Sequence, residues 1–210
     1  WALKNTGQNQ GTAGIDINHL PAREVTQGSS DIIVAVLDHG TQLDHPDLNV
    51  SSKSYDTETG RSPSQIWGNH GTACSGIISA KTNNNLGVAG IAPNCPVMSI
   101  SNQLMGTSDA PQKRADGFNW AWRNGASVIS NSWRSSTFSE LLEDAIQSAM
   151  TNGRNGLGCV VTFSAGNYDS NTVGYPARSL PDIIVVGALS LSGKRKSSTT
   201  IDNEGWWGSD

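Results

Sequence analysis

Residues 32–40 read Ile-Ile-Val-Ala-Val-Leu-Asp-His-Gly, an unbroken apolar run that ends on a carboxylate, an imidazole and a glycine. A short run without alternating polar residues is expected of a strand that is buried on both faces. Such strands occur in parallel sheets that helices cover on both sides. This stretch therefore predicts an α/β fold, with Asp38 at the carboxyl end of a buried strand.

The rest of the chain alternates strand patterns with helix patterns. Apolar residues recur at helical spacing from Phe138 to Met150, and Asn152-Gly153 is a typical helix stop. A weaker helical stripe runs from Ala115 to Trp122. Because strand and helix alternate, we expect a three-layer, doubly wound, mostly parallel sheet with helices on both faces, in one domain over residues 1–210. The other predicted strands are residues 97–100, 127–130, 159–163 and 183–186.

The composition argues against several classes of protein. Fourteen Lys and Arg against eighteen Asp and Glu give a net charge of −4, so we expect no nucleic-acid partner. The apolar runs are too short to span a bilayer, so we expect no membrane partner, and residues 1–5 lack the pattern of a signal peptide. The three cysteines form no CxxC pair and cannot all be paired with one another, so a disulfide scaffold is not expected.

Three polar side chains adjoin predicted strands or a helix start, where parallel sheets place their sites. Asp38 ends the first strand, His70 lies in a stretch of small residues, and Asn167 follows the fourth strand. Taken alone, Asp38 is better explained as part of a strand-ending turn and His70 as a surface histidine, and an asparagine beside a glycine, as at Asn167, is common in loops. Together they suit acyl transfer, since a carboxylate can orient an imidazole base and an amide can donate to an oxyanion.

These residues lie in six stretches whose order and content resemble the subtilisin-like serine proteases, or subtilases, of the bacterial secreted type. The resemblance implies a secreted endopeptidase that hydrolyses polypeptides through an Asp-His-Ser triad. The six stretches are residues 32–40 with 45–48, 69–72, 83–93, 128–133, 164–167, and 175–177 continuing through 184–188.

The resemblance also implies a role for individual residues. Asp38 matches the triad aspartate, His70 the general base and Asn167 the side-chain donor of the oxyanion hole. The substrate strand and one wall of the specificity pocket would contain Ser130, Ser132, Trp133 and Arg134, and the opposite wall Ser164, Ala165 and Gly166.

A calcium site and a structural cysteine follow from the same resemblance. The Asp47 carboxylate, the Asn84 side chain and the backbone carbonyls of Thr82, Leu86 and Val88 would bind Ca²⁺, with Gln8 or Gln10 completing the site. The other interpretation of this segment is an asparagine-rich turn. Cys74, one helical turn after His70, is expected to be a small buried residue rather than a nucleophile.

The sequence departs from the family at the nucleophile. The serine motif is expected roughly twenty to thirty-five residues beyond Asp210. The fold is therefore expected to lack its C-terminal part, which would act as a partner segment, and these 210 residues alone are expected to be inactive. Gly106-Thr107-Ser108 resembles the motif, but a helix cap and a solvated helix face explain it better.

Two further departures bear on specificity and chemistry. Arg134 stands where the family usually has glycine, so its side chain would narrow the substrate groove or favour an acidic substrate. His39 adds a second imidazole beside Asp38.

Two other functions remain as alternatives. One is a non-catalytic module that binds extended peptides along residues 130–133. The other, a nucleotide-binding domain, lacks the expected Gly-x-Gly-x-x-Gly after the first strand.

Overall fold

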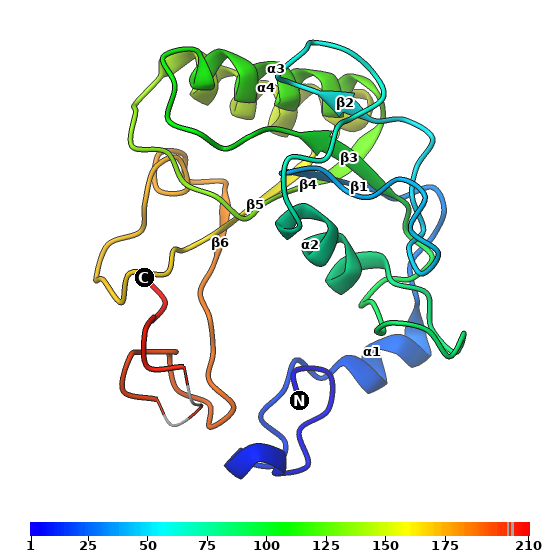
Figure 1. Cartoon of the computed structure of the whole chain (residues 1–210), viewed down its shortest axis with the longest axis vertical. Helices are drawn as coiled ribbons and strands as arrows, with labels where there is room; N and C mark the ends of the chain where they lie inside the picture. Colours follow the sequence, from blue (N-terminus) through cyan, green and yellow to red (C-terminus); the bar gives the residue numbers. More distant parts are fainter. Residues whose placement is uncertain (201, 203) are drawn as a thin grey trace.

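A six-stranded parallel sheet forms the centre of the computed structural model, which describes residues 1–200, 202 and 204–210 (Figure 1). The spatial order of the strands is β2-β3-β1-β4-β5-β6. After β1 the chain forms the edge strand β2, returns to place β3 between β2 and β1, and then builds outward on the other side through β4, β5 and β6. The point where the order reverses is the usual place for a site in such sheets. The strands are β1 (Ile33–Asp38), β2 (Tyr55–Asp56), β3 (Val97–Ser101), β4 (Ala126–Asn131), β5 (Val160–Ser164) and β6 (Ile184–Val186).

Helices cover both faces of this sheet, as the sequence predicts. Helices α3 (Ala110–Arg123) and α4 (Glu140–Gly156) pack side by side on one face, and α2 (His70–Ser79) lies against β1 and β3 on the other (Figure 1). Helix α1 (His19–Val25) and a 3₁₀ turn, η1 (Gln8–Gln10), precede the sheet. The α/β class and the layers are therefore confirmed. Within the described residues, no helix is long and apolar enough to cross a membrane.

The main core lies between the sheet and the pair α3–α4. Leu37 on β1 and Ile129 on β4 are fully buried there, and Leu142 and Ile146 on α4 pack against them in one cluster. Burying apolar side chains of this size is the principal source of stability. β6 differs, because all three of its residues are exposed.

Two details of the expected elements change. Helix α4 begins at Glu140, because the Ser139 hydroxyl accepts the Leu142 backbone N–H as an N-cap. Phe138 therefore lies outside the helix, is 65% exposed and packs on Tyr175 instead of joining the buried stripe. Strand β2 was not predicted, because two residues carry no periodic pattern.

Candidate active site

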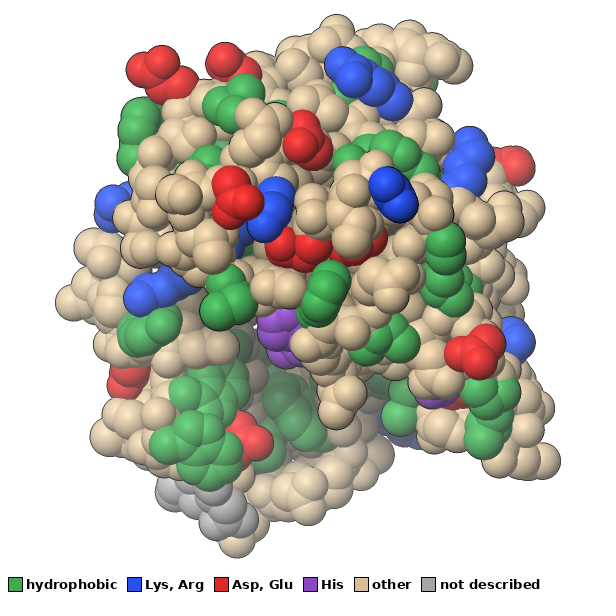
Figure 2. Space-filling view, turned by 45° about the horizontal axis from the view of Figure 1, so that its top comes forward, with side chains coloured by type: hydrophobic (Ala, Val, Ile, Leu, Met, Phe, Trp, Pro, Cys, Tyr) green, Lys and Arg blue, Asp and Glu red, His purple; other side chains and the backbone are tan. Residues whose placement is uncertain are grey.

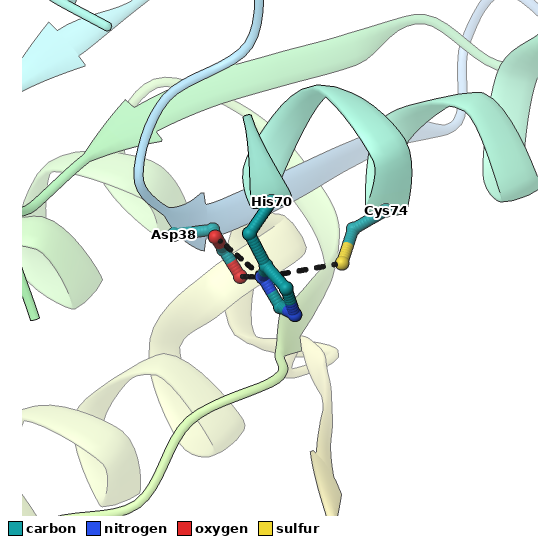
Figure 3. Close-up of side chains that lie close together, drawn as sticks. All are labelled: Asp38, His70 and Cys74. Carbon is teal, nitrogen blue, oxygen red and sulfur yellow. Dashed lines mark hydrogen bonds and ion pairs between the residues drawn. The ribbon is translucent and has the colours of Figure 1, made fainter. Parts of the chain in front are cut away.

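Asp38 and His70 meet at the carboxyl end of β1. The Nδ1 atom of His70 lies 2.8 and 2.9 Å from the two carboxylate oxygens of Asp38 (Figure 3). The Asp38 side chain is 1% exposed and also accepts the His39 backbone N–H at 2.7 Å. The His70 side chain is 51% exposed. A buried carboxylate thus fixes one ring nitrogen, while the imidazole remains open to solvent.

Glycine residues bring helix α2 close enough to β1 for this contact. His70 is the first residue of α2, and Gly71 follows it. A Cβ atom on Gly71 would lie 2.5 Å from the carbonyl oxygen of Gly40, which no real contact allows. Gly40 itself has a φ of +94° and sits just after Asp38 and His39. The small residues around His70 therefore position the imidazole.

Cys74 lies one turn along α2, on the same side as His70 (Figure 3). Its Sγ atom is 3.7 Å from Nδ1 of His70. Burial raises the pKa of the Cys74 thiol, and the nearby Asp38 carboxylate raises it further. A thiol held protonated is a poor nucleophile. Cys74 is only half-buried, however, so the buried position expected for it is wrong.

His70 and Asn167 line one cavity of about 610 Å³ beyond the ends of β4 and β5. Ser130, Ser132, Ser164 and Gly166 line the same cavity. Figure 2 shows that this face of the molecule is hollowed near its centre, with a histidine side chain (purple) at the edge of the hollow. The Asn167 amide is exposed and makes no hydrogen bond with the described residues, so it is free to donate to a bound group.

The segment that holds Asn167 is fixed by residues that the sequence did not reveal. The Asp210 carboxylate accepts the backbone N–H groups of Tyr168 at 2.8 Å and of Ser170 at 3.0 Å. The Asp210 backbone N–H in turn donates to the Gly166 carbonyl. These bonds enclose Asn167 on both sides, so Asp210 is a positioning residue. Its partners lie about forty positions earlier in the chain, and no local pattern indicates the pairing.

Trp133 connects β4 to β1 rather than offering its ring to the groove. The indole N–H donates to the Leu37 carbonyl at 3.0 Å, and the side chain is 7% exposed. The buried Arg114 guanidinium lies 4.9 Å from the centre of the indole ring. Trp133 still contributes surface to a second cavity, of about 590 Å³, and Arg134 and Tyr168 line this cavity too. Ala165, between the lining residues Ser164 and Gly166, is buried.

Of the residues expected to bind calcium, Asn84 and Val88 contact the Asp47 carboxylate, which is almost fully buried. Its two oxygens accept the Asn84 side-chain N–H at 2.7 Å and the Val88 backbone N–H at 3.1 Å. These hydrogen bonds lower the pKa of Asp47, with the Asn84 bond first, although burial opposes them. A Cβ atom on Gly87 would lie 2.1 Å from the carboxylate, so the loop wraps tightly around it.

By residue type this donor set suits a hard cation, because a carboxylate, a side-chain amide and backbone carbonyls (Thr82, Leu86 and Val88) can all offer oxygen. Asn84, however, turns its N–H toward Asp47 while its oxygen accepts the Leu86 backbone N–H, so binding an ion would require the amide to rotate. The proposed completing glutamines are engaged elsewhere. The Gln8 side chain bonds to Lys4 and Thr6, and Gln10 lines a different cavity beside Leu189.

Ser108 lies away from both cavities. It precedes α3, where Thr107 bonds to the Asp109 carboxylate and accepts the Ala110 backbone N–H. The segment therefore leads into the helix, but Asp109 at the N-cap position makes no side-chain cap hydrogen bond, and the Ala110 N–H bonds to the backbone carbonyl of Thr107.

The comparison with known protein families gives one extended match. Residues 29–207 match the family described as Subtilase family. The chain is 34% identical over 181 residues to Subtilisin NAT of Bacillus subtilis subsp. natto, covering 83% of this chain and 45% of that protein. It is 30% identical over 234 residues to the Calcium-dependent protease of Trichormus variabilis, covering 98% of this chain and 33% of that protein. The chain thus spans less than half the length of these relatives.

Solved structures agree with the fold. MycP1 with its N-terminal propeptide removed superposes with a TM-score of 0.68 at 20% identity, over 85% of this chain and 62% of that one. The Prenylagaramide maturation protease PagA gives a TM-score of 0.63 at 25% identity, over 83% and 59%.

Proposed function

This chain belongs to the subtilase family, and from that premise we propose that it forms the greater part of the active site of a subtilisin-type serine endopeptidase. The observation that carries the proposal is the contact between Asp38 and Nδ1 of His70, at a cavity that Asn167 also lines. The substrate would be a polypeptide lying along the Ser130–Trp133 segment.

In the proposed reaction His70 is the general base and then the general acid. The Asp38 carboxylate keeps the proton on Nδ1 and leaves Nε2 free to accept a proton from a serine hydroxyl. The serine oxygen attacks the peptide carbonyl, and Nε2 then gives its proton to the leaving amine. Asn167 donates its amide N–H to the oxyanion that forms. The nucleophilic serine belongs to a C-terminal segment of the full-length protein outside these 210 residues.

The proposal includes a bound calcium ion and secretion from the cell. Support for calcium comes from the buried Asp47 carboxylate in its tight loop and from a relative named Calcium-dependent protease. Bound at Asp47, the ion would stabilise the loop of residues 82–88 that packs on it. A chelator should therefore lower the melting temperature of the wild-type protein but not of Asp47→Ala. If the chelator leaves the melting temperature of the wild-type protein unchanged, the proposed calcium site is wrong.

Secretion of the protein follows from the family resemblance. Detection of the protein in the culture medium tests it.

An activity-based label tests the central proposal. The full-length natural protein would be treated with an organophosphonate serine probe, and the adduct mapped by mass spectrometry. We expect one labelled serine C-terminal to residue 210, and loss of labelling in His70→Ala. Labelling of Ser108 would overturn the assignment of the nucleophile. Absence of labelling combined with retained peptide affinity would support the non-catalytic binding module instead.

A further inference from the structure

The 590 Å³ cavity beside the candidate active site has one charged residue in its wall. Among the described residues that line it, Arg134 alone is charged, and none is acidic. Around Arg134 the wall is aromatic, because Tyr168, Trp206 and Trp207 line the cavity as well. A single cation in an uncharged, largely aromatic wall is a strong determinant of which side chain binds there.

The guanidinium of Arg134 is held by its flat face. Its Cζ atom lies 3.5 Å from the centre of the Tyr168 ring, a close cation–π stack. A Cβ atom on Gly174 would come within 3.3 Å of the Arg134 Cδ, so the backbone at Gly174 packs against the arginine stem. Stacking leaves the N–H groups at the edge of the guanidinium unused, and they form no hydrogen bond or ion pair with the described residues.

The neighbouring carboxylates of Asp169 and Asp210 bond to groups other than Arg134, although Oδ2 of Asp210, beside Gly166, has no hydrogen-bond partner among the described residues. Asp169 pairs with Arg195 at 3.2 Å and accepts the Ser198 hydroxyl at 2.8 Å. Asp210 accepts the backbone N–H groups of Tyr168 and Ser170. The positive charge of Arg134 is therefore not neutralised by a local ion pair, and a carboxylate entering the cavity would find donors in the fork geometry that it prefers.

We propose that Arg134 makes this protein selective for an acidic side chain at the substrate residue immediately before the cleaved bond. This inference rests on the proposed function, which makes the cavity between Ser132–Arg134 and Ser164–Asn167 a substrate pocket. Tyr168 acts as the platform that holds the guanidinium in place. A side chain ending in a carboxylate accepts the edge N–H groups, whereas the matching amide accepts them without charge and more weakly.

Matched peptides test the selectivity. Two substrates would differ only in Glu or Gln before the cleaved bond, and kcat/KM would be measured for each with the full-length protein. We expect the Glu peptide to be favoured about tenfold, the size of a charge-assisted hydrogen bond. Raising the salt concentration should reduce the ratio, because the pair is partly exposed.

Substitutions assign the effect to Arg134. Arg134→Gln should lower kcat/KM for the Glu peptide alone and bring the ratio close to one. Arg123→Gln is the matched control, because Arg123 stacks on Trp122 on α3 and lines neither cavity. In this variant the ratio of kcat/KM for the Glu peptide to that for the Gln peptide should stay at the wild-type value. A wild-type ratio near one, or an equal loss for both peptides in Arg134→Gln, would overturn the proposal.

A binding measurement separates this inference from the proposed function. Fluorescent peptides that end in Glu or Gln would be titrated into the full-length protein, and their affinities compared by anisotropy. Selective binding of the Glu peptide that Arg134→Gln abolishes, without hydrolysis of any peptide, would support the acidic pocket and reject the protease. Hydrolysis of both peptides at equal rates would support the protease and reject the acidic pocket.

Discussion

At the scale of single residues, the site combines a buried carboxyl group with an exposed imidazole. The Asp38 side chain is 1% exposed and fixed by the His39 backbone, whereas half of the His70 side chain is in contact with solvent. Burial makes the carboxylate rigid, and exposure leaves the imidazole accessible to a substrate. Neither property is visible from the identity of the residues alone.

Replacing the buried anion should destroy activity without moving the histidine. Asp38→Asn keeps the shape, but its amide N–H would donate to Nδ1 and place the imidazole proton on Nε2. We expect kcat of the full-length protein to fall by about four orders of magnitude. The control is Asp44→Asn, because the exposed carboxylate of Asp44 accepts the Gln42 side-chain N–H and lines neither cavity, so this variant should retain wild-type kcat. A kcat within tenfold of wild type in Asp38→Asn would contradict the proposed role.

Removing the amide of Asn167 should affect the rate more than binding. Asn167→Ala deletes a donor that is needed only when the oxyanion forms. We therefore expect kcat to fall about 10²- to 10³-fold, with KM changed little. Steady-state kinetics separates the two constants. A rise in KM with unchanged kcat would instead assign Asn167 to ground-state binding.

At the scale of the elements, the closeness of α2 to β1 decides whether the site forms. Gly71→Ala places a methyl group against the Gly40 carbonyl and should push the first turn of α2 outward. We expect kcat to fall at least tenfold, together with a lower melting temperature, because displacement by a fraction of an ångström misaligns the base. Gly106→Ala, which has no neighbour within 4 Å, is the control for adding a methyl group. Unchanged kcat in Gly71→Ala would show that α2 tolerates the shift.

The loop over Asp47 should lose stability in acid. Its hydrogen bonds lower the folded-state pKa of Asp47 below the ordinary value of about 3.9. The group therefore contributes stability that is fully present above the ordinary pKa and is lost as pH falls through the lowered pKa. With chelator present, the melting temperature of the wild type should exceed that of Asp47→Asn at neutral pH. The difference should shrink below about pH 4. A difference that is independent of pH would contradict this origin.

The elements also show how far the sequence alone can lead. Strand β1 and the layer order followed from apolar runs, because burial on both faces imposes that composition. Phe138 fits the helical spacing of the apolar residues and was expected in the helix. Ser139 caps α4, however, so the helix begins at Glu140 and Phe138 lies before it. Spacing reports which residues could share a face, whereas the cap decides where the helix begins.

The site was predictable only in part. The contact of Asp38 with His70 was expected from the family resemblance, and the geometry is consistent with it. The Asp210 bonds to the Asn167 segment could not be anticipated, because the Asp210 carboxylate accepts backbone N–H groups, and every residue type except proline carries such a group. The stack of Arg134 on Tyr168 joins residues 34 positions apart in the sequence (168 − 134), and no local sequence pattern indicates that they meet.

At the scale of the whole molecule, the sheet is protected unequally along its width. Strand β1 lies at the centre beneath helices on both faces, whereas β6 lies at the rim with all three side chains exposed. The rim is apolar, since Ile184, Val185 and Val186 are 51%, 37% and 56% exposed.

Strand β6 should make these 210 residues prone to self-association. Among the described residues, no further strand pairs with its outer side, so its backbone groups offer a template on which a second molecule could add a strand. We expect concentration-dependent oligomers in sedimentation velocity, and Ile184→Lys should suppress them because a charge at a sheet edge opposes stacking of like copies. Ile66→Lys, at a similarly exposed position outside the sheet, should leave the oligomers in place. If the wild type stays monomeric at high concentration, the apolar β6 edge does not drive self-association. Repulsion between molecules that each carry a net charge of −4 would then keep them apart.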